Sequence, residues 1–540
     1  MTTIAEEPAS GDAAAARPPG PTTGAFARLV AAGILLSRVA GLIREGIFSH
    51  YFGTSLYASA FRVALRMPNA LQNLLGEGTL SASFIPVYAE LLERGEKEQA
   101  GRIAGAVFAL LLAVAGGLAL CGVLLAPVLV DIFFPGATGE LRDVTVACTR
   151  IIFPMTGMLV LSAWSLGVLN SHRKFFVSYF APVLWNAAMI ATLLLLGGGL
   201  EQRPLVIALA WGALLGGGLQ FLIQLPWVLR LERQLRIHWS TTDAGVRTVI
   251  GNAGPAVLGR GVVQLSTYVD MFLASFLFTG AAAALGYAQT IYILPYSLFG
   301  MSVAAAELPE LARRGIAEAG ALRRRISTGL RQIALFIIPS TVGFITLGDV
   351  IVGALYQRGD FVRADTLLVW VVLAGYTLGL VASTATRLYV SAFYALKNTR
   401  TPAKVALVRV LIAGGVGVGL MLILEKYRLA GRPLGVLGLS LAAGVGAWVE
   451  WALLRRSLGA RIGGFASSAG VLGRMAIAAL AGAVAGRLLL LLLPALHPIV
   501  LAGITIPAFA AVYFVTARAL GVEQAATLMD RYLRRFRLRR

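Results

Sequence analysis

Residues 103–130 read IAGAVFALLLAVAGGLALCGVLLAPVLV. This stretch contains no charged residue and consists mostly of Leu, Ala, Val and Gly. A helix of about 20 apolar residues crosses the roughly 30 Å of hydrocarbon in a bilayer. The stretch is therefore long enough to cross a membrane as a single helix.

Similar stretches recur along nearly the whole chain of 540 residues. Hydrophobic residues make up 58%, charged residues only 14%, and the mean hydropathy is +0.78. A soluble protein cannot bury that much apolar surface. The predicted fold class is therefore an all-α polytopic membrane protein. By length and hydropathy we expect 14 spans, near residues 25–50, 56–92, 102–130, 143–170, 175–199, 204–228, 245–278, 280–311, 328–355, 365–396, 402–425, 433–454, 466–493 and 498–520.

Alternate loops differ in their content of Lys and Arg. Cytoplasmic loops carry the excess of these residues, so the difference predicts the orientation of the chain. Both termini are predicted to be cytoplasmic, and the number of spans is even. The net charge of +21 then serves topology and contact with anionic lipids, and no nucleic-acid partner is expected. The basic set comprises 94–102, 173–174, 230–247, 313–331, 397–404, 455–461 and 531–540, and the opposite set 142, 203, 358–363 and 426–432.

Paired prolines indicate an internal duplication. Pro68 and Pro86 lie in the second span, Pro295 and Pro309 lie in the eighth, and each pair leads to a basic turn. Two lobes around a central cavity are the typical build of a secondary transporter. We therefore expect a disordered cytoplasmic tail at 1–24, an N-lobe at 25–228, a C-lobe at 245–457, two further spans within 466–520 and a basic cytoplasmic tail at 521–540.

Enzyme signatures are missing from the sequence. No lysine follows a glycine, so there is no phosphate loop for ATP hydrolysis, and the four histidines form no His-Glu-x-x-His pair. Cys121 and Cys148 cannot build a disulfide framework. We expect no catalytic residue, metal or cofactor. The alternative of a membrane glycan polymerase would need an extracytoplasmic carboxylate, and Asp360 is the only obvious candidate.

The first two spans carry an unusual number of charged residues. Each costs about 2.5–3.5 kcal/mol on insertion scales, so they are expected to face a cavity or a partner. Arginine suits phosphate because its fork of donors matches phosphate oxygens. The alternative is a set of internal ion pairs that hold helices together. The charges are Arg38, Arg44, Glu45, Arg62, Arg66 and Glu77, and helical spacing joins Arg62, Arg66, Asn69, Asn73 and Glu77 into one predicted stripe.

Three charges occur in later spans. Arg260 and Asp270 lie in the seventh span, about 15 Å apart along a helix, so they are not expected to pair with each other. Arg260 is predicted to project into the cavity from the second lobe. Asp270 is a candidate ligand for a coupling cation, although pairing with another helix is favoured. Arg387 lies in the tenth span and is, like Asp270, a candidate for an ion pair or for the coupling-ion site.

Several short motifs resemble those of the MurJ/MviN family of lipid II flippases, and they occur in the same order along the chain. The resemblance covers residues of about 25 to 520 and implies a fold of 14 helices in two lobes plus an extra pair. The motifs are SRVAGLIRE at 37–45, FG at 52–53, PN at 68–69, GEG at 76–78, FIPVYAE at 84–90, GP at 254–255, LYQRGDF at 355–361, AFYALKNTRTP at 392–402 and GVLGL at 435–439.

The resemblance implies translocation of undecaprenyl-diphosphate-linked peptidoglycan precursor across the bacterial cytoplasmic membrane by alternating access. Arg38 and Arg44 match family arginines needed for function, Arg44 would contact the lipid diphosphate, and Glu77 matches an acidic residue near the cavity. The expected partners are lipid II and membrane lipids, and we expect a functional monomer. The membrane potential, at about 2.3 kcal/mol per charge and 100 mV, or a coupling cation would reset the carrier.

The chain departs from the family pattern at three positions. Ser59 stands where members commonly carry Asp, and Gln72 and Thr290 stand where they commonly carry Arg. We expect Arg62, Arg66 and Arg260 to restore the missing positive charge. A related alternative is a flippase or exporter for another lipid-linked glycan or a small molecule.

Overall fold

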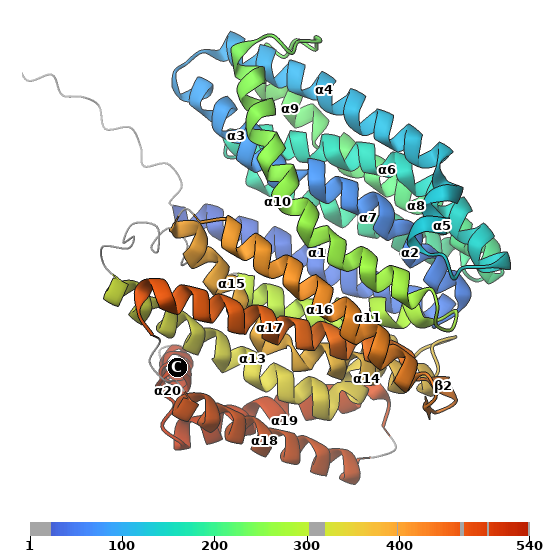
Figure 1. Ribbon diagram of the computed structural model, residues 1–540, viewed down its shortest axis with the longest axis vertical. Coiled ribbons are helices and arrows are strands. Elements are labelled where there is room, and N and C mark those ends of the chain that lie inside the picture. Colours follow the sequence, from blue (N-terminus) through green and yellow to red (C-terminus); the bar gives the residue numbers. More distant parts are fainter. Residues whose placement is uncertain (1–22, 302–318, 397, 465–468, 494–495, 538–540) are drawn as a thin grey trace, which may run out of the picture.

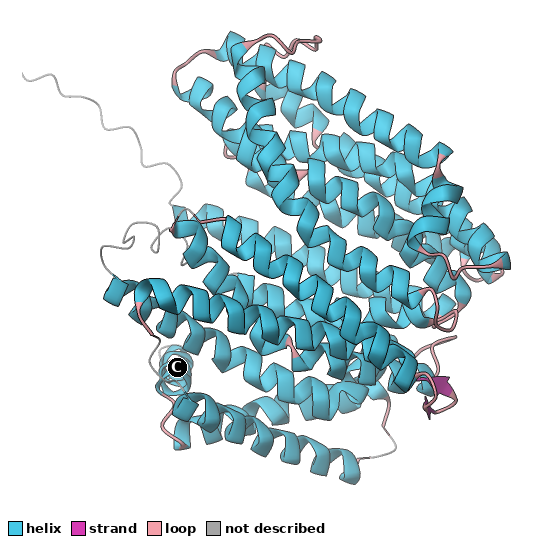
Figure 2. Ribbon diagram, viewed as in Figure 1, coloured by secondary structure: helices cyan, strands magenta, loops and turns pink. Residues whose placement is uncertain are grey.

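The structure, a computed structural model, describes residues 23–301, 319–396, 398–464, 469–493 and 496–537. For some residues within these ranges it describes the backbone alone. Almost all of this part of the chain is helical (Figure 2). A small hairpin of β1 (Arg428–Leu429) and β2 (Arg432–Pro433) turns through Ala430 and Gly431, both at positive φ. The predicted disordered tail at 1–24 lies almost entirely outside the described residues, which begin with the first helix at Thr23.

The helices before residue 232 pack together and are called the first helix group (Figure 1). In this group α1 packs along α7, and α6 contacts α2, α4 and α8. The buried centre is apolar and includes Phe48, Phe61 and Ile152. The group consists of α1 (Thr23–Phe52), α2 (Leu56–Leu75), α3 (Glu77–Glu93), α4 (Lys97–Leu124), α5 (Ala126–Phe133), α6 (Gly139–Ser171), α7 (Phe175–Leu196), α8 (Gln202–Leu222) and α9 (Leu225–Leu231).

The helices from α11 to α17 form the second helix group. Helices α18 (Ala469–Leu492) and α19 (Pro498–Ala519) pack against each other and against α13, and α20 (Glu523–Arg537) packs on α19. The second group consists of α11 (Ala281–Pro295), the π-helical turn η1 (Tyr296–Met301), α13 (Ala319–Tyr356), α14 (Arg363–Leu378), α15 (Leu380–Ala395), α16 (Arg400–Leu424) and α17 (Gly435–Ile462).

Helix α10 (Ala244–Ala274) connects the two groups and crosses between them (Figure 1). Val246 and Val249 near its start are buried with Tyr88 and Ile103 of the first group, whereas α10 also packs along α16 of the second group. Helix α10 thus packs against both helix groups. The lobe limits expected from the sequence, 25–228 and 245–457, stay a prediction.

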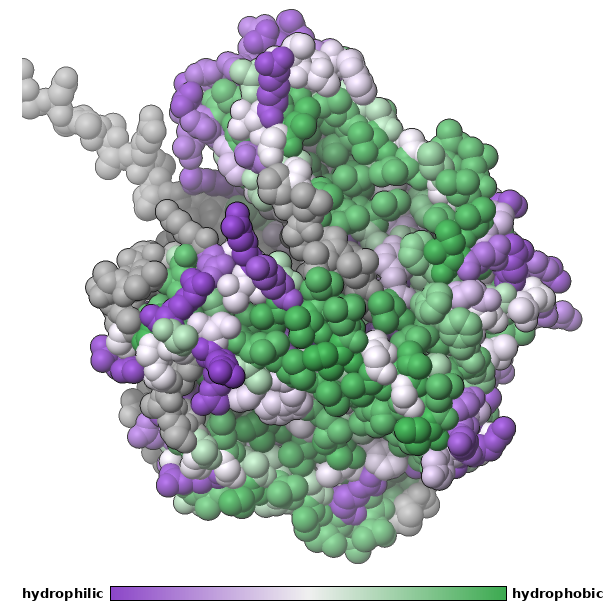
Figure 3. Space-filling view, viewed as in Figure 1, coloured by the Kyte–Doolittle hydropathy of each residue, from purple (hydrophilic) through white to green (hydrophobic). Residues whose placement is uncertain are grey.

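Nine described helices are long and apolar enough to cross a membrane, or ten if the bent pair α14 and α15 counts as one span. The other four predicted spans correspond to α1, to α2 with α3, to α10 and to α11 with η1. The predicted number of 14 spans is therefore not settled. Apolar surface covers the middle of the molecule, and hydrophilic residues gather at its left and right edges (Figure 3). This distribution is what a multi-pass membrane protein requires.

Several predicted spans are not continuous helices. The predicted span at 56–92 breaks at Gly76, where a Cβ would lie 2.4 Å from the Gln72 carbonyl oxygen. Another break follows α4 at Leu125, just before Pro127, because proline has no amide hydrogen to donate to the carbonyl four residues earlier and its ring clashes with that carbonyl. Helices α14 and α15 bend by 41° at Gly379. The second copy of the predicted proline repeat, around Pro309, lies outside the described residues.

The two helix groups meet at one end, which we call the joined end; it carries the α1–α2 and α13–α14 loops. There the Tyr287 hydroxyl donates to the Gly53 carbonyl at 2.9 Å, and the Asp360 amide donates to the His50 carbonyl at 2.9 Å. The opposite end, called the basic end, carries the α3–α4 loop with Arg94 and the α9–α10 loop with Arg233 and Arg236. There the ribbons of the two groups diverge (Figure 1).

Candidate functional site

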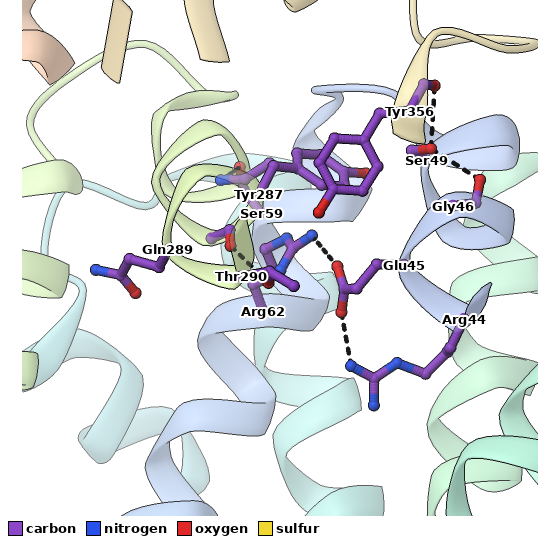
Figure 4. A network of polar contacts seen from close by, with 12 residues as sticks. Arg44, Glu45, Gly46, Ser49, Ser59, Arg62, Tyr287, Gln289, Thr290 and Tyr356 are labelled. Carbon is purple, nitrogen blue, oxygen red and sulfur yellow. Dashed lines mark hydrogen bonds and ion pairs between the residues drawn. The ribbon is translucent and has the colours of Figure 1, made fainter. Parts of the chain in front are cut away.

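A buried carboxylate holds two arginines together between α1 and α2 (Figure 4). Glu45 accepts from Arg44 Nη2 on one carboxylate oxygen at 2.6 Å and from Arg62 Nη2 on the other at 2.5 Å. The three side chains are only 8%, 14% and 13% exposed. Two guanidinium groups against one carboxylate leave this network, called the charge network below, with excess positive charge.

Arg62 also reaches the second helix group. Its guanidinium lies 4.1 Å from the centre of the Tyr287 ring of α11 and 5.2 Å from that of Phe48. A Cβ on Gly286 would lie 2.6 Å from Arg62 Cδ, so glycine makes room for the arginine at this crossing. Among the described residues, Arg62 Nε has no hydrogen-bond partner. The guanidinium therefore keeps one unused donor.

Arg66, one helical turn further along α2, continues the contact between the groups. It donates to Gln289 Oε1 on α11, and Gln289 Nε2 donates to the Tyr376 hydroxyl on α14 at 2.8 Å. Asp270 on α10 is within electrostatic reach of Arg66 and of Arg409. Arg66 thus joins α2 to α11.

Toward the joined end, polar contacts close the gap between the groups. Ser59 Oγ accepts from the Ala283 amide at 3.2 Å, and the Thr54 hydroxyl donates to Asp365 at 2.6 Å. Gln202 donates to the Asp360 carboxylate at 2.7 Å. Asp360, the candidate for polymerase chemistry, is therefore part of a contact between helix groups.

On its other side the charge network borders a cavity inside the first helix group. Arg44 Nη1 donates to Asn186 Oδ1 at 3.1 Å and lies 4.9 Å from the Trp185 ring centre. Asn186 and Trp185 line a cavity of about 290 Å³, together with Asn69, Gln72 and Glu77. Asn186 is thus shared between the charge network and the cavity.

The predicted stripe along α2 is wrong in one respect, because it is not continuous. The break at Gly76 moves Glu77 onto α3. Arg62 and Arg66 contact the second helix group, whereas Asn69 and Glu77 line the cavity of the first. Arg44, Glu45 and Arg62 form internal ion pairs in this structure, which is the alternative that the sequence left open for these charges.

The remaining predicted residues lie apart from the charge network. Arg38 makes no hydrogen bond or ion pair within the described part of the chain. The side chain of Arg260 lies outside what the structure describes. Arg387 is exposed and donates to the Tyr296 hydroxyl. Thr290 stands where the family pattern commonly has Arg, and its hydroxyl donates to the Gly286 carbonyl of its own helix.

Sequence reasoning missed the uncharged partners of the arginines. They are Asn186, Tyr287, Gln289 and Tyr376. Polar residues inside apolar spans were a usable signal for Asn186 and Gln289, but nothing in one sequence shows which helix they face. No group of three or more His, Cys, Asp or Glu side chains suited to a metal ion occurs among the described residues.

Comparisons with known proteins agree with this architecture. The sequence model of the family described as lipid II flippase MurJ matches residues 48–515. The probable lipid II flippase MurJ of Haemophilus influenzae is 31% identical over 440 residues, which are 78% of this chain and 84% of that protein. The lipid II flippase MurJ of Burkholderia cenocepacia is 31% identical over 428 residues, covering 78% and 80% of the two chains.

Solved structures show the same fold. A lipid II flippase MurJ in an inward closed conformation aligns with a TM-score of 0.73 at 24% identity, covering 91% of this chain and 98% of that one. An inward-facing multidrug resistance MATE transporter of the MOP superfamily aligns with a TM-score of 0.63 at 18% identity, covering 81% and 98%. These are transporter folds, and the family match extends over most of the sequence. The chain belongs to the lipid II flippase MurJ family.

Proposed function

We propose that this chain translocates lipid II, the undecaprenyl-diphosphate-linked peptidoglycan precursor, from the inner to the outer leaflet of the bacterial cytoplasmic membrane. The observation that carries this proposal is the family match over residues 48–515. The charge network supports it independently, because two buried arginines on one carboxylate suit a diphosphate.

Transport would proceed by alternating access. Cytoplasmic loops carry the excess of Lys and Arg, so the basic end faces the cytoplasm, together with both termini. The joined end then faces outward, and the described conformation is closed on that side. Substrate would reach the arginines from the cytoplasmic side. Separation of the contacts at the joined end would release it outward.

The arginines are proposed to act as follows. Arg44 contacts the diphosphate, and Arg62 and Arg66 add positive charge that the family commonly carries at the positions of Gln72 and Thr290. Arg38 would add further positive charge for the diphosphate, and so would Arg260, as its position in the predicted seventh span suggests. Glu45 holds Arg44 and Arg62 in place when no substrate is bound. A diphosphate that competes for both guanidinium groups would loosen Arg62 from Glu45 and Tyr287, and thus weaken a contact between the helix groups.

The remaining partners are part of the same proposal. The carrier would work as a monomer among anionic membrane lipids, with no nucleic-acid partner and no cofactor. The membrane potential, or a coupling cation with Asp270 as a candidate ligand, would drive its return. Moving one charge through 100 mV supplies about 2.3 kcal/mol, enough to shift a two-state equilibrium substantially.

Complementation tests the proposal. The lipid II flippase of a host bacterium is depleted, this chain is expressed, and lipid II on the outer leaflet is measured. Rescue is expected from the unaltered chain and from Arg94→Ala, whose side chain is 60% exposed and pairs with Glu90 at the surface. Rescue is expected to be lost in Arg44→Ala. A well-inserted chain that fails to restore lipid II exposure would contradict the proposal.

A further inference from the structure

A second cluster of charges lies apart from the charge network, where α13, α14 and α18 meet. Asp349 of α13 accepts from Arg487 Nη2 of α18 at 3.2 Å and from Arg363 Nη2 of α14 at 3.4 Å. The Asp349 side chain is 10% exposed, whereas those of Arg363 and Arg487 are 54% and 40% exposed. These two arginines, called the outer arginine pair below, thus share one buried carboxylate. The cluster keeps one positive charge in excess.

The carboxylate of Asp349 holds the outer arginine pair loosely. Hydrogen bonds between a guanidinium and a carboxylate are usually about 2.7–2.9 Å long. Arg142, at the same end of the molecule, donates to Asp131 from Nε at 2.6 Å and from Nη2 at 2.8 Å. The bonds of the outer arginine pair to Asp349 are 3.2 Å to 3.4 Å long. Since each guanidinium has five N–H donors, the pair keeps donors for a second anion.

Both arginines lie near the ends of their helices, at the joined end. Arg363 is the first residue of α14, and Arg487 lies about 8 Å before the end of α18 at Leu492. The headgroup region adds about 5–8 Å on each side of the hydrocarbon core. In the proposed orientation the joined end faces outward. The outer arginine pair therefore lies at the depth of the headgroups of the outer leaflet.

The surface around Arg487 is apolar. Val484, Leu488 and Leu491, within one helical turn of Arg487 on the same face of α18, all have exposed side chains. The ring centre of Trp370 lies 5.7 Å from the Arg487 guanidinium, and its indole N–H is bonded to carbonyls of α13. Tryptophan is enriched where the hydrocarbon core meets the headgroups. The surroundings suit a ligand that joins an anionic group to apolar chains.

We propose that the outer arginine pair binds the phosphate of an anionic phospholipid of the outer leaflet, with its acyl chains along the exposed apolar face of α18. The fork of donors on each arginine matches phosphate oxygens, and the excess charge favours an anionic over a zwitterionic headgroup. The diphosphate of lipid II shares this chemistry. However, α18 packs against α13 and α19, whereas contacts between the helix groups involve α1 and α2. The site is therefore separate from the charge network, and the inference does not depend on the cargo.

Photolabelling of the purified full-length chain in detergent micelles tests the inference. The probe is phosphatidylglycerol with a diazirine in one acyl chain, and the label on peptides of α18 is measured by mass spectrometry. Unlabelled phosphatidylglycerol is expected to displace the probe at a concentration at least tenfold lower than phosphatidylcholine with the same acyl chains. Arg363→Gln and Arg487→Gln should each weaken probe binding at α18 about tenfold, since each removes charged hydrogen bonds to the phosphate.

Two further variants separate lipid binding from a loss of structure. Arg142→Gln is the matched control, because Arg142 also lies at the joined end but is balanced by its own carboxylate, Asp131. It should keep the full labelling of α18. Asp349→Asn removes the carboxylate that competes with the phosphate, so it should strengthen probe binding severalfold. A variant that merely unfolded would lose binding.

The inference is overturned if phosphatidylcholine displaces the probe as well as phosphatidylglycerol does, if Arg363→Gln and Arg487→Gln keep the labelling of α18, or if Asp349→Asn weakens it. Stronger displacement by undecaprenyl diphosphate than by phosphatidylglycerol would assign the site to the substrate and overturn it as well. Failure of the chain to rescue the flippase-depleted host would contradict the proposed function alone, because the labelling does not involve transport.

Discussion

Glu45 balances two arginines that would otherwise repel each other inside the protein. Its carboxylate is 8% exposed and bonds Arg44 and Arg62 at 2.6 Å and 2.5 Å. Removing one partner of a buried ion pair costs about 3–5 kcal/mol, because the remaining charge is left uncompensated. We therefore expect Glu45→Gln to lower the free energy of unfolding by about this amount, measured by thermal unfolding in detergent micelles.

Glu90→Gln makes the same chemical change at an exposed ion pair. Glu90 and Arg94 are 59% and 60% exposed, and such surface pairs contribute about 0–1 kcal/mol. This variant should unfold close to the temperature of the unaltered chain. Equal losses in Glu90→Gln and Glu45→Gln would mean that burial of the charge network does not stabilise the protein.

The charged members of the site could be predicted from the sequence, but their uncharged partners could not. Arg44, Glu45 and Arg62 stand out because charge inside an apolar span requires a partner. Asn186 follows Arg44 by 142 residues, and Gln289 follows Arg66 by 223 residues. Only the packing of distant helices brings these pairs together, and no local pattern encodes it.

Helices α16 and α17 approach each other closely because Gly438 has no side chain. A Cβ at this position would lie 2.6 Å from the backbone of Leu420 and Met421 on α16. Small residues allow such close packing between membrane helices. Gly438→Ala should force the helices apart and destabilise the protein by about 1–3 kcal/mol, measured as a lower unfolding temperature in micelles.

The control for this prediction is Gly419→Ala on α16. No atom lies within 4 Å of a Cβ built on Gly419, so the added methyl meets open space. Alanine favours a helix over glycine by up to about 1 kcal/mol, and this variant should be neutral or slightly more stable. Destabilisation of both variants to the same extent would show that helix contact at Gly438 is not the cause.

Hydropathy locates membrane helices but not the breaks within them. At the break at Gly76 a Cβ would meet the Gln72 carbonyl, and at the bend at Gly379 the backbone passes close to Gly444 of α17. Neither contact changes the average hydropathy of its span. The helix α20 was also not predicted, since the charged residues of this segment suggested a tail.

At the scale of the whole molecule, the hydrogen bonds between the helix groups are concentrated toward one end. We consider the hydrogen bonds that join a described residue of α1–α9 to a described residue after Ala274. Each of these bonds involves the second half of α1, the first two-thirds of α2, or a loop of the joined end. The bond that lies furthest along α2 from the joined end connects Arg66 to Gln289. If the chain works by alternating access, these contacts must separate in every transport cycle.

A covalent bridge across the joined end should therefore stop transport. Gln202→Cys with Asp360→Cys, joined by a short cleavable thiol reagent in a chain without Cys121 and Cys148, replaces a 2.7 Å contact between the two groups. We expect lipid II exposure to stop on bridging and to return on cleavage. A matched bridge between Tyr57→Cys and Glu140→Cys replaces a 2.8 Å contact within the first group and should leave transport intact. Continued transport with the first bridge fully formed would contradict separation of the groups at this end, whereas arrest by both bridges would point to the reagent itself.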